Sequence, residues 1–302
     1  MSQPPPPVVT IILNWNGCDD TIACVRSAQA LHDVNNRILV VDNGSTDNSL
    51  PRLRAEFPDL WLLETGANLG YAGGNNAGIR AAIGSGAEFV WLLNNDTTVD
   101  SGALAALVAA LKQRPDAGIA GSKIYYAAQP DTLWSAGGRY TTPYGFAESR
   151  GIGTRDVGQY DLPEDVEFAT GCSLLVRREV FETIGPLRED YFVYWEDVDF
   201  NAAAAAAGWQ ILYAPGSRVW HKVGASMGSV PGRADLLQLR YEVRNRILFH
   251  RRHHPSRAPR VIYHAFSHAV RNLLSRPNRQ KGLTMLRGIA DGLCNRRGRI
   301  AT

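Results

Sequence analysis

The first third of the chain alternates short apolar runs with segments of helical periodicity. Four runs are rich in β-branched and aliphatic residues, end in polar residues and are too short for helices: 8–15, 37–42, 61–65 and 89–93. Helices are expected between and after them, at about 18–31, 46–56, 74–85 and 101–113. This alternation predicts an α/β fold with a mostly parallel central sheet that is flanked by helices on both faces.

Polar residues follow all four predicted strands. Asn or Asp stands beside glycine or a second amide in each loop, at 14–17, 42–45, 68–76 and 94–96. One such loop is ordinary turn chemistry, and 94–96 could simply lead into a helix that Asp100 or Ser101 caps. Four of them at one edge favour a lined crevice, because open α/β sheets bind ligands at the carboxyl ends of their strands.

The segment NLGYAGGNNAG at 68–78 holds four glycines and three asparagines. Its backbone N–H groups could cradle a phosphate or ribose at the start of the helix that follows. It matches neither the P-loop pattern nor the dinucleotide fingerprint after a first strand. It therefore favours nucleotide binding of another kind over a P-loop NTPase or a standard Rossmann dehydrogenase.

The middle of the chain loses this rhythm. Short strands are expected at 118–127 and 131–140, a long binding-type loop at 141–164, and a strand followed by a short helix at 166–185. The next segment, YFVYWEDVDFNAAAAAAGW at 191–209, sets acids among aromatic residues at the start of an alanine-rich helix. The helix dipole alone favours acids there, so a structural role is one interpretation. Partial desolvation, which raises a carboxylate pKa towards the range of a general base, supports a catalytic one.

Three side chains stand out as candidates for chemistry. Asp197, beside Glu196, is the candidate general base. His221 ends a strand-like segment just as Asp96 follows the strand at 89–93. A lone histidine is usually structural, but imidazole and carboxylate together, completed by water and phosphate oxygens, suit Mn²⁺ or Mg²⁺.

Charge divides the chain of 302 residues, whose formal net charge is +3. Residues 235–302 carry 15 Lys and Arg against three acids, whereas residues 1–234 carry 17 Lys and Arg against 26 acids. We expect the boundary near 225–235 and two or three amphipathic helices after it. The basic part is either a packed helical cap or a peripheral contact with an anionic membrane. The acidic body argues against nucleic acid as a partner.

The remaining composition predicts a cytoplasmic protein. Residues 1–7 are short, proline-rich and uncharged, which indicates a disordered lead-in rather than a signal peptide. The four cysteines show neither zinc spacing nor a paired framework, so reduced thiols are expected. No window approaches the roughly 18 apolar residues of a membrane span.

Six ordered segments resemble the bacterial family 2 glycosyltransferases, above all the rhamnosyltransferase-like members that build cell-wall and O-antigen polysaccharides. They are VTIILNWNG, ILVVDNGSTDNS, NLGYAGGNNAGI, VWLLNNDTTVD, YWEDVDF and VWHKVGAS, and the match covers about residues 8–250. The resemblance implies a GT-A domain at 8–230, with a nucleotide-sugar-binding half at 8–115 and an acceptor-binding half at 116–230. The basic helical extension follows at 231–302. The resemblance also implies inverting transfer of a sugar from a nucleoside diphosphate sugar to a hydroxyl of a glycan or lipid-diphosphate-linked acceptor.

The resemblance also assigns roles to residues. Asn94-Asn95-Asp96 stands where the family has its D-x-D metal motif, with Asn94 in place of the first acid. Asp96 then holds Mn²⁺ or Mg²⁺, His221 completes the metal site, and Asp197 with its neighbour Glu196 provides the catalytic base. Contacts with the nucleotide sugar are expected from Asn14, Asn16, Asp42, Asn68, Asn75, Asn94, Asn95 and Arg244.

Several questions stay open at this point. The family usually has an Asp–Glu pair before YF, whereas this chain reads Leu187-Arg188-Glu189-Asp190, which concerns local acceptor contacts. Subgroup likeness implies dTDP-L-rhamnose as donor, with UDP-galactofuranose, a UDP-hexose or a GDP-sugar as alternatives. A nucleotidyltransferase usually needs a glycine-rich basic loop near the first strand, and LNWNGCDD has no Lys or Arg. A sugar-nucleotide-binding module without catalysis is the non-enzymatic alternative.

Overall fold

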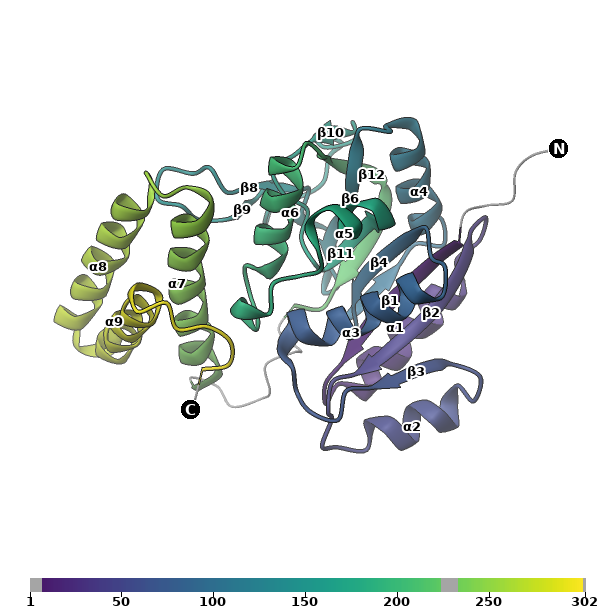
Figure 1. Cartoon of the computed structure of the whole chain (residues 1–302), viewed down its shortest axis with the longest axis horizontal. Helices are drawn as coiled ribbons and strands as arrows, with labels where there is room; N and C mark the ends of the chain where they lie inside the picture. The colour runs from purple at the N-terminus through teal and green to yellow at the C-terminus, as the bar shows by residue number, and fades with distance from the viewer. Residues whose placement is uncertain (1–6, 224–232, 301–302) are drawn as a thin grey trace.

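The computed structural model, which describes residues 7–223 and 233–300, has a ten-stranded sheet on one side and three helices on the other (Figure 1). The strand order is β10-β12-β6-β11-β4-β1-β2-β3, with β5 paired to β12 and β7 paired to β6. Helices cover both faces of the sheet, as the strand–helix alternation predicts.

The four predicted N-terminal strands are present and parallel. They are β1 (Pro7–Asn14), β2 (Asn35–Asp42), β3 (Trp61–Glu64) and β4 (Phe89–Asn94). The accompanying helices are α1 (Cys18–Gln29), α2 (Ser49–Glu56), α3 (Gly70–Gly84) and α4 (Ala103–Gln113). Pro7 belongs to β1 and not to a disordered lead-in, whose other residues, 1–6, lie outside the described residues.

The middle of the chain completes the sheet. Its longer strands are β6 (Ala117–Tyr126), β7 (Gln129–Ser135), β11 (Ser173–Arg177) and β12 (Gln210–His221). The predicted long loop and its two ends hold the two-residue strands β8 (Gly138–Arg139), β9 (Glu148–Ser149) and β10 (Glu164–Asp165). Two helices and a 3₁₀ turn follow β11: α5 (Arg178–Ile184), η1 (Glu189–Tyr191) and α6 (Glu196–Ala206). β11 runs antiparallel to β4 and β6, whereas β12 runs parallel to β6.

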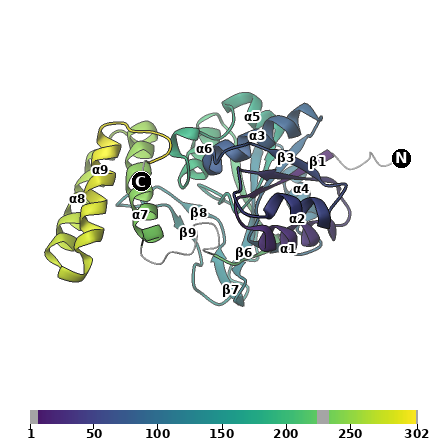
Figure 2. The same ribbon diagram turned by 90° about the horizontal axis from the view of Figure 1, so that it is seen from below.

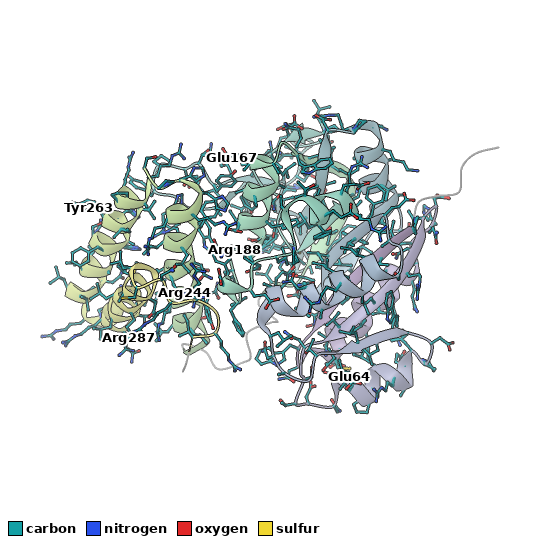
Figure 3. The ribbon with its side chains drawn as sticks, viewed as in Figure 1. Glu64, Glu167, Arg188, Arg244, Tyr263 and Arg287 are labelled. Atoms are coloured by element: carbon teal, nitrogen blue, oxygen red, sulfur yellow. The ribbon has the colours of Figure 1, made fainter. Side chains whose placement is uncertain are left out.

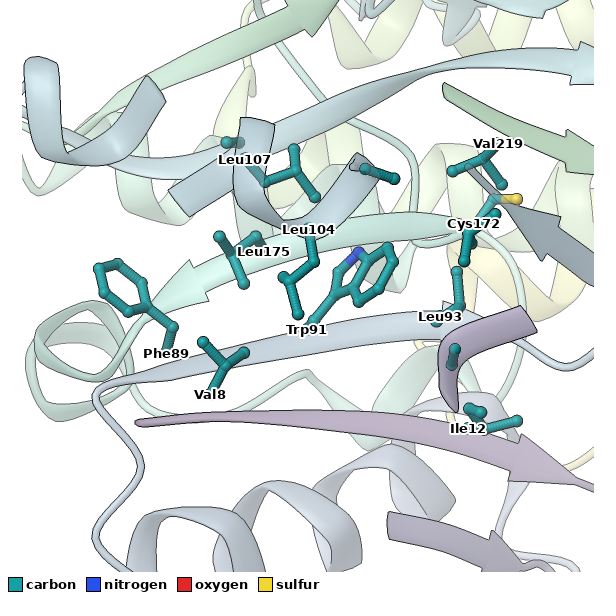
Figure 4. Packing of buried hydrophobic residues seen from close by; sticks show 14 of the residues in the cluster. Val8, Ile12, Phe89, Trp91, Leu93, Leu104, Leu107, Cys172, Leu175 and Val219 are labelled. Carbon is teal, nitrogen blue, oxygen red and sulfur yellow. The ribbon is translucent and has the colours of Figure 1, made fainter. Parts of the chain in front are cut away.

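Alternate residues of the central strands are buried on opposite faces of the sheet. One set packs with α1, α2 and α4 (Figure 4): Val8, Ile12, Phe89, Trp91 and Leu93. The other set packs with α3, α5 and α6: Val9, Ile11, Val90 and Leu92. Burial on both faces explains why these strands read as uninterrupted apolar runs.

The segment after β4 differs from the expected turn into a capped helix. Residues Thr97–Val99 form a short strand, β5, which pairs antiparallel with the end of β12. α4 begins only at Ala103, so neither Asp100 nor Ser101 caps it; Asp100 Oδ1 instead accepts the N–H of Gly102 at 3.0 Å. The loop after β4 is therefore tied to the end of β12.

The basic part of the chain forms α7 (Arg233–His253), α8 (Ala258–Leu274), the 3₁₀ turn η3 (Arg276–Asn278) and α9 (Arg279–Leu293). Both views place α7 between the rest of the protein and the pair α8–α9 (Figures 1 and 2). Most of the boundary predicted near 225–235 lies at 224–232, outside the described residues. Within the described parts of the chain, no helix combines the length and apolarity of a membrane span. All four cysteines are unpaired.

Candidate functional site

A cavity of about 870 Å³ lies between the sheet and the C-terminal helices. Its walls include the candidate side chains from distant parts of the sequence: Asn94, Asp96, Glu196, Asp197 and His221. The predicted metal-binding acid and the predicted base, a hundred positions apart, thus share one pocket.

β5 brings Asp96 and His221 together. Thr97 is paired with His221 across the β5–β12 ladder, and the N–H of Lys222 donates to the backbone oxygen of Asp96 at 2.9 Å. The side chains of Asp96 and His221 are buried, and Nε2 of the histidine lies 3.1 Å from Oδ1 of the aspartate. A strand pairing of only three residues therefore sets the geometry of the pair.

The Asp96–His221 pair fits a divalent cation. Asp96 Oδ1 is buried and, apart from this contact with His221, has no hydrogen-bond partner among the described residues. Burial lowers the pKa of His221, but Cys172 and Asp96 act in the opposite direction and the net effect raises this pKa to about 10. A cation would replace that proton between one oxygen and one nitrogen donor. No group of three or more His, Cys, Asp or Glu in the described parts of the chain could hold a metal, so further ligands would come from substrate or water.

Asp197 lies in the first turn of α6 and accepts two backbone hydrogen bonds. The N–H of Gly171 donates to Oδ2 and the N–H of Val198 donates to Oδ1, both at 2.8 Å. Gly171 lies just before β11, which pairs with β4, and there the N–H of Asn94 donates to the oxygen of Cys172 at 3.0 Å. Burial raises the pKa of Asp197, and the two N–H groups oppose this by stabilising the carboxylate.

Glu196 has a different environment from Asp197. Burial raises the pKa of Glu196 well above its usual range, and the charge of Asp197 raises it further. Glu196 Oε2 has no hydrogen-bond partner within the described residues. Of the two neighbouring acids, Asp197 is therefore the one that the protein supports as a carboxylate.

A strained turn precedes these acids. Phe192, Tyr194 and Trp195 all have positive φ angles, of 66°, 65° and 76°. Such a conformation costs a non-glycine residue about 1–3 kcal/mol and persists only when its surroundings hold it. The amide of Asn245 on α7 donates to the carbonyl oxygens of three residues of this turn, at 3.1, 2.8 and 2.8 Å: Tyr191, Val193 and Tyr194. α7 thus holds the turn that positions Asp197.

Replacing Asn245 with alanine should lower the free energy of unfolding by about 2–3 kcal/mol, because buried carbonyls lose their donor. The predicted transfer reaction should slow mainly in kcat, since the turn before Asp197 would relax. Denaturant unfolding and steady-state kinetics measure the two effects. The control Asn48→Ala removes an exposed amide without a capping bond on α2 and should change neither quantity. Equal behaviour of the two variants would contradict a holding role for Asn245.

Arg244 does not lie where we expected. Its guanidinium is buried and donates to the backbone oxygens of Tyr191 and Gly298, at 2.8 and 2.7 Å (Figure 3). Arg246 lines the cavity instead. The two residues point about 160° apart around α7, so only one of them can face the pocket. Arg246 is buried, lies 4.1 Å from the ring centre of Phe146, and makes no ion pair with any described residue.

The glycine-rich segment also differs from expectation. Asn68 lies in the loop, but α3 begins at Gly70, so Asn75 is on the helix and donates to the oxygen of Tyr71. The N–H groups of Tyr71 and Ala72 donate to the oxygen of Phe192, at 2.7 and 3.5 Å, and are not free to cradle a phosphate. Gly70 has φ +78°, and a Cβ there would lie 2.4 Å from the same oxygen. The segment therefore packs against the strained turn.

The other predicted contacts with the nucleotide sugar join the loops at the carboxyl edge. Asn14 donates to Asp42 at 2.8 Å, and both are buried. Asn16 accepts the N–H of Thr46, Asn68 accepts the N–H of Gly70, and Asn95 donates to Thr21. The lining of the large cavity contains Asn94 but none of the other predicted nucleotide-sugar contacts: Asn14, Asn16, Asp42, Asn68, Asn75, Asn95 and Arg244.

Several pocket residues were not predicted. Tyr71 lines the cavity and donates its hydroxyl to the oxygen of Gly171 at 2.7 Å. The ring of Trp134 meets the ring of His221 edge-on, with the ring centres 4.6 Å apart. Cys172 and Arg246 complete this group. Arg188, which departs from the family pattern, pairs with Asp190 and is not part of the lining (Figure 3).

Known proteins resemble this chain in sequence. Residues 9–185 match the model of glycosyl transferase family 2. The N-acetylglucosaminyl-diphospho-decaprenol L-rhamnosyltransferase of Mycobacterium tuberculosis is 31% identical over 212 residues, which is 64% of this chain and 69% of the relative. The low-salt glycan biosynthesis hexosyltransferase Agl10 of Haloferax volcanii is 30% identical over 167 residues, 54% of this chain and 51% of the relative.

Solved structures resemble it in fold. A mannosyltransferase of Pyrobaculum calidifontis, in complex with GDP-Man and Mn²⁺, has a TM-score of 0.58 and 15% identity over 96% of this chain and 87% of its own. GalNAc-T7 with UDP, GalNAc and Mn²⁺ has a TM-score of 0.60 and 16% identity, over 80% of this chain and 49% of its own. The predicted GT-A fold is confirmed. The family match spans more than half of the chain, which therefore belongs to glycosyl transferase family 2, among its rhamnosyltransferase-like members.

Proposed function

We propose that this glycosyltransferase moves a sugar, with inversion, from a nucleoside diphosphate sugar to a hydroxyl of a lipid-diphosphate-linked glycan. The observation that carries the proposal is the shared cavity, which has the Asp96–His221 pair and the Asp197 carboxylate in its walls. In this proposal residues 8–115 bind the nucleotide sugar, 116–230 bind the acceptor, and 231–302 close the pocket from the other side. The protein would act at the cytoplasmic face of a membrane.

Asp197 provides the base in this mechanism. Its carboxylate accepts the proton of the acceptor hydroxyl while that oxygen bonds to the anomeric carbon, and the bond from this carbon to the diphosphate oxygen breaks. The raised pKa of Asp197 improves its ability to hold the proton, while the N–H groups of Gly171 and Val198 keep it ionised before the reaction. A divalent cation, Mn²⁺ or Mg²⁺, held by Asp96 and His221 would neutralise charge on the leaving diphosphate.

The sugar and the acceptor follow from similarity rather than from the pocket. The M. tuberculosis relative is named as an L-rhamnosyltransferase that acts on a diphospho-decaprenol acceptor. This supports dTDP-L-rhamnose as donor and a polyprenyl-diphosphate-linked sugar as acceptor. The names of the H. volcanii and P. calidifontis proteins support a hexose or mannose donor as the alternative.

Donor identity can be tested with a panel of nucleotide sugars. Thermal unfolding would be followed with dTDP-rhamnose, UDP-galactofuranose, UDP-hexoses and GDP-mannose, each with Mn²⁺, Mg²⁺ or neither. We expect the largest rise in Tm with dTDP-rhamnose, and only when a metal is present. Release of nucleoside diphosphate upon addition of acceptor then shows transfer. Binding without any release, or release of inorganic diphosphate instead, would contradict the proposed reaction.

Arg246→Gln should raise the KM for the nucleotide sugar about tenfold with a smaller effect on kcat. The substitution removes a buried cation that faces the pocket, so the diphosphate of the donor would lose a charged partner. Arg240→Gln, in the same helix but paired with Asp291, is the matched control. Steady-state kinetics with varied donor measures both variants. A normal KM for Arg246→Gln would exclude this arginine from donor binding.

A further inference from the structure

One side of α8 is apolar and exposed. Tyr263, Phe266 and Leu274 are 73%, 51% and 83% exposed, and with Val270 they follow the spacing i, i+3, i+7 and i+11 of a single helical stripe. A different side of the same helix is already buried against its neighbours, through Val261, Ala265 and Ala269. α8 therefore has two apolar sides, and the described residues cover only one of them.

Exposed cations surround this stripe. Arg260 and Arg271 lie beside it on α8, three residues before and eight residues after Tyr263. Others follow at the turn into α9 and along α9, where Leu283 is also 44% exposed: Arg276, Arg279, Lys281 and Arg287. None of these six cations has an ion pair with a described residue. No Asp or Glu occurs in the sequence between Glu242 and Asp291.

We propose that this α8–α9 surface, made of Tyr263, Phe266, Leu274, Leu283 and the six cations around them, binds an anionic lipid bilayer. The cations select a negatively charged partner, and the exposed aromatic and aliphatic side chains require an apolar phase. The interface of an anionic bilayer provides both within a few ångströms of depth. A nucleic acid would pair with the cations but leave the apolar stripe in water.

The position of this surface relative to the cavity gives it a function, which rests on the function proposed above. His268 of α8 and Met285 of α9 line the same cavity as Asp96 and Asp197. Tyr263 and Arg287 lie on these helices at the end of the molecule away from the sheet (Figure 3). α8 and α9 thus lie between the bilayer and the cavity, so a lipid-linked acceptor could present its sugar to Asp197 while its lipid stays in the membrane.

Vesicle flotation tests the surface without any sugar substrate, so its result does not depend on whether transfer occurs. The full-length protein is mixed with phosphatidylcholine vesicles that contain or lack phosphatidylglycerol. We expect binding only to the anionic vesicles, with strong salt dependence. The triple variant Arg276→Gln, Arg279→Gln, Lys281→Gln should bind them about 100-fold more weakly, from about fivefold per charge. The double variant Tyr263→Ser, Phe266→Ser should also lose most of its binding.

A matched triple variant neutralises three exposed cations on other parts of the protein: Arg80→Gln, Lys112→Gln and Arg155→Gln. It should bind like the unmodified protein. Equal binding of both triple variants would show that only overall charge matters, and equal binding to neutral vesicles would exclude anionic selection; either result overturns the proposal. All substituted side chains are exposed, and an unchanged Tm confirms that loss of binding is not loss of folding.

Discussion

Asp197→Asn is expected to lower sugar transfer by about 10²–10⁴-fold while leaving donor binding nearly intact. The amide keeps the size of the side chain but cannot accept the proton of the acceptor hydroxyl. Donor binding should persist because the Asp96–His221 pair does not involve Asp197. Single-turnover measurements of transfer, together with calorimetric titration of the donor, separate the two effects.

Glu196→Gln is the matched control for this variant. Burial and the neighbouring Asp197 raise the pKa of Glu196 well above its usual range, which favours the neutral acid, so an amide should alter the rate far less here than at Asp197. The pH profile adds a second readout. Because the pKa of Asp197 is raised, the acid-side loss of kcat should occur above the ordinary aspartate range and be absent in Asp197→Asn. A fully active Asp197→Asn enzyme would remove Asp197 from the role of base.

Asp96→Asn should lower transfer by about 100-fold or more, because the charge on the departing diphosphate would lose several kcal/mol of stabilisation. Unlike Asp197→Asn, this variant should also bind Mn²⁺ and the nucleotide sugar more weakly. His221→Ala should show the same two losses, because its Nε2 lies 3.1 Å from Oδ1 of Asp96 and both atoms would contact the same cation. Mn²⁺ titration followed by electron paramagnetic resonance, with and without nucleoside diphosphate, measures the binding directly.

Asp100→Asn is a suitable control, because Asp100 follows the same loop but caps a turn through Gly102 and is absent from the cavity lining. Its metal affinity and turnover should match those of the unmodified protein. Removal of divalent ions with excess chelator should stop turnover, and Mn²⁺ should restore it. Undiminished turnover in chelator would exclude a metal at the Asp96–His221 pair.

The fold was predictable where burial alone determines an element. β1, β2 and β4 pack on both faces, so their sequences are continuously apolar and stop at the polar carboxyl edge. β5 was not predictable, because its three residues carry no periodicity and it exists only through pairing with β12, far along the chain. The prediction that Asp100 or Ser101 caps the helix after β4 was wrong for the same reason.

The candidate site shows a similar division. Asp96, His221 and Asp197 stand out in the sequence as ionisable groups at the ends of apolar segments, and the structure gathers them into one cavity; their catalytic roles remain predictions. The choice between Arg244 and Arg246 depends on how α7 is rotated against the body, which packing decides. The N–H groups at the start of α3 likewise meet the oxygen of Phe192, a partner that local sequence does not reveal.

The most direct test of the account is the location of Mn²⁺ in crystals grown with a nucleoside diphosphate. Anomalous scattering from manganese identifies the ion without assumptions about the ligands. We expect one peak between Asp96 Oδ1 and His221 Nε2, in contact with the diphosphate and facing the cavity that Asp197 lines. A peak on another surface, or a nucleotide bound away from this cavity, would contradict the proposal that one pocket holds both the metal and the base.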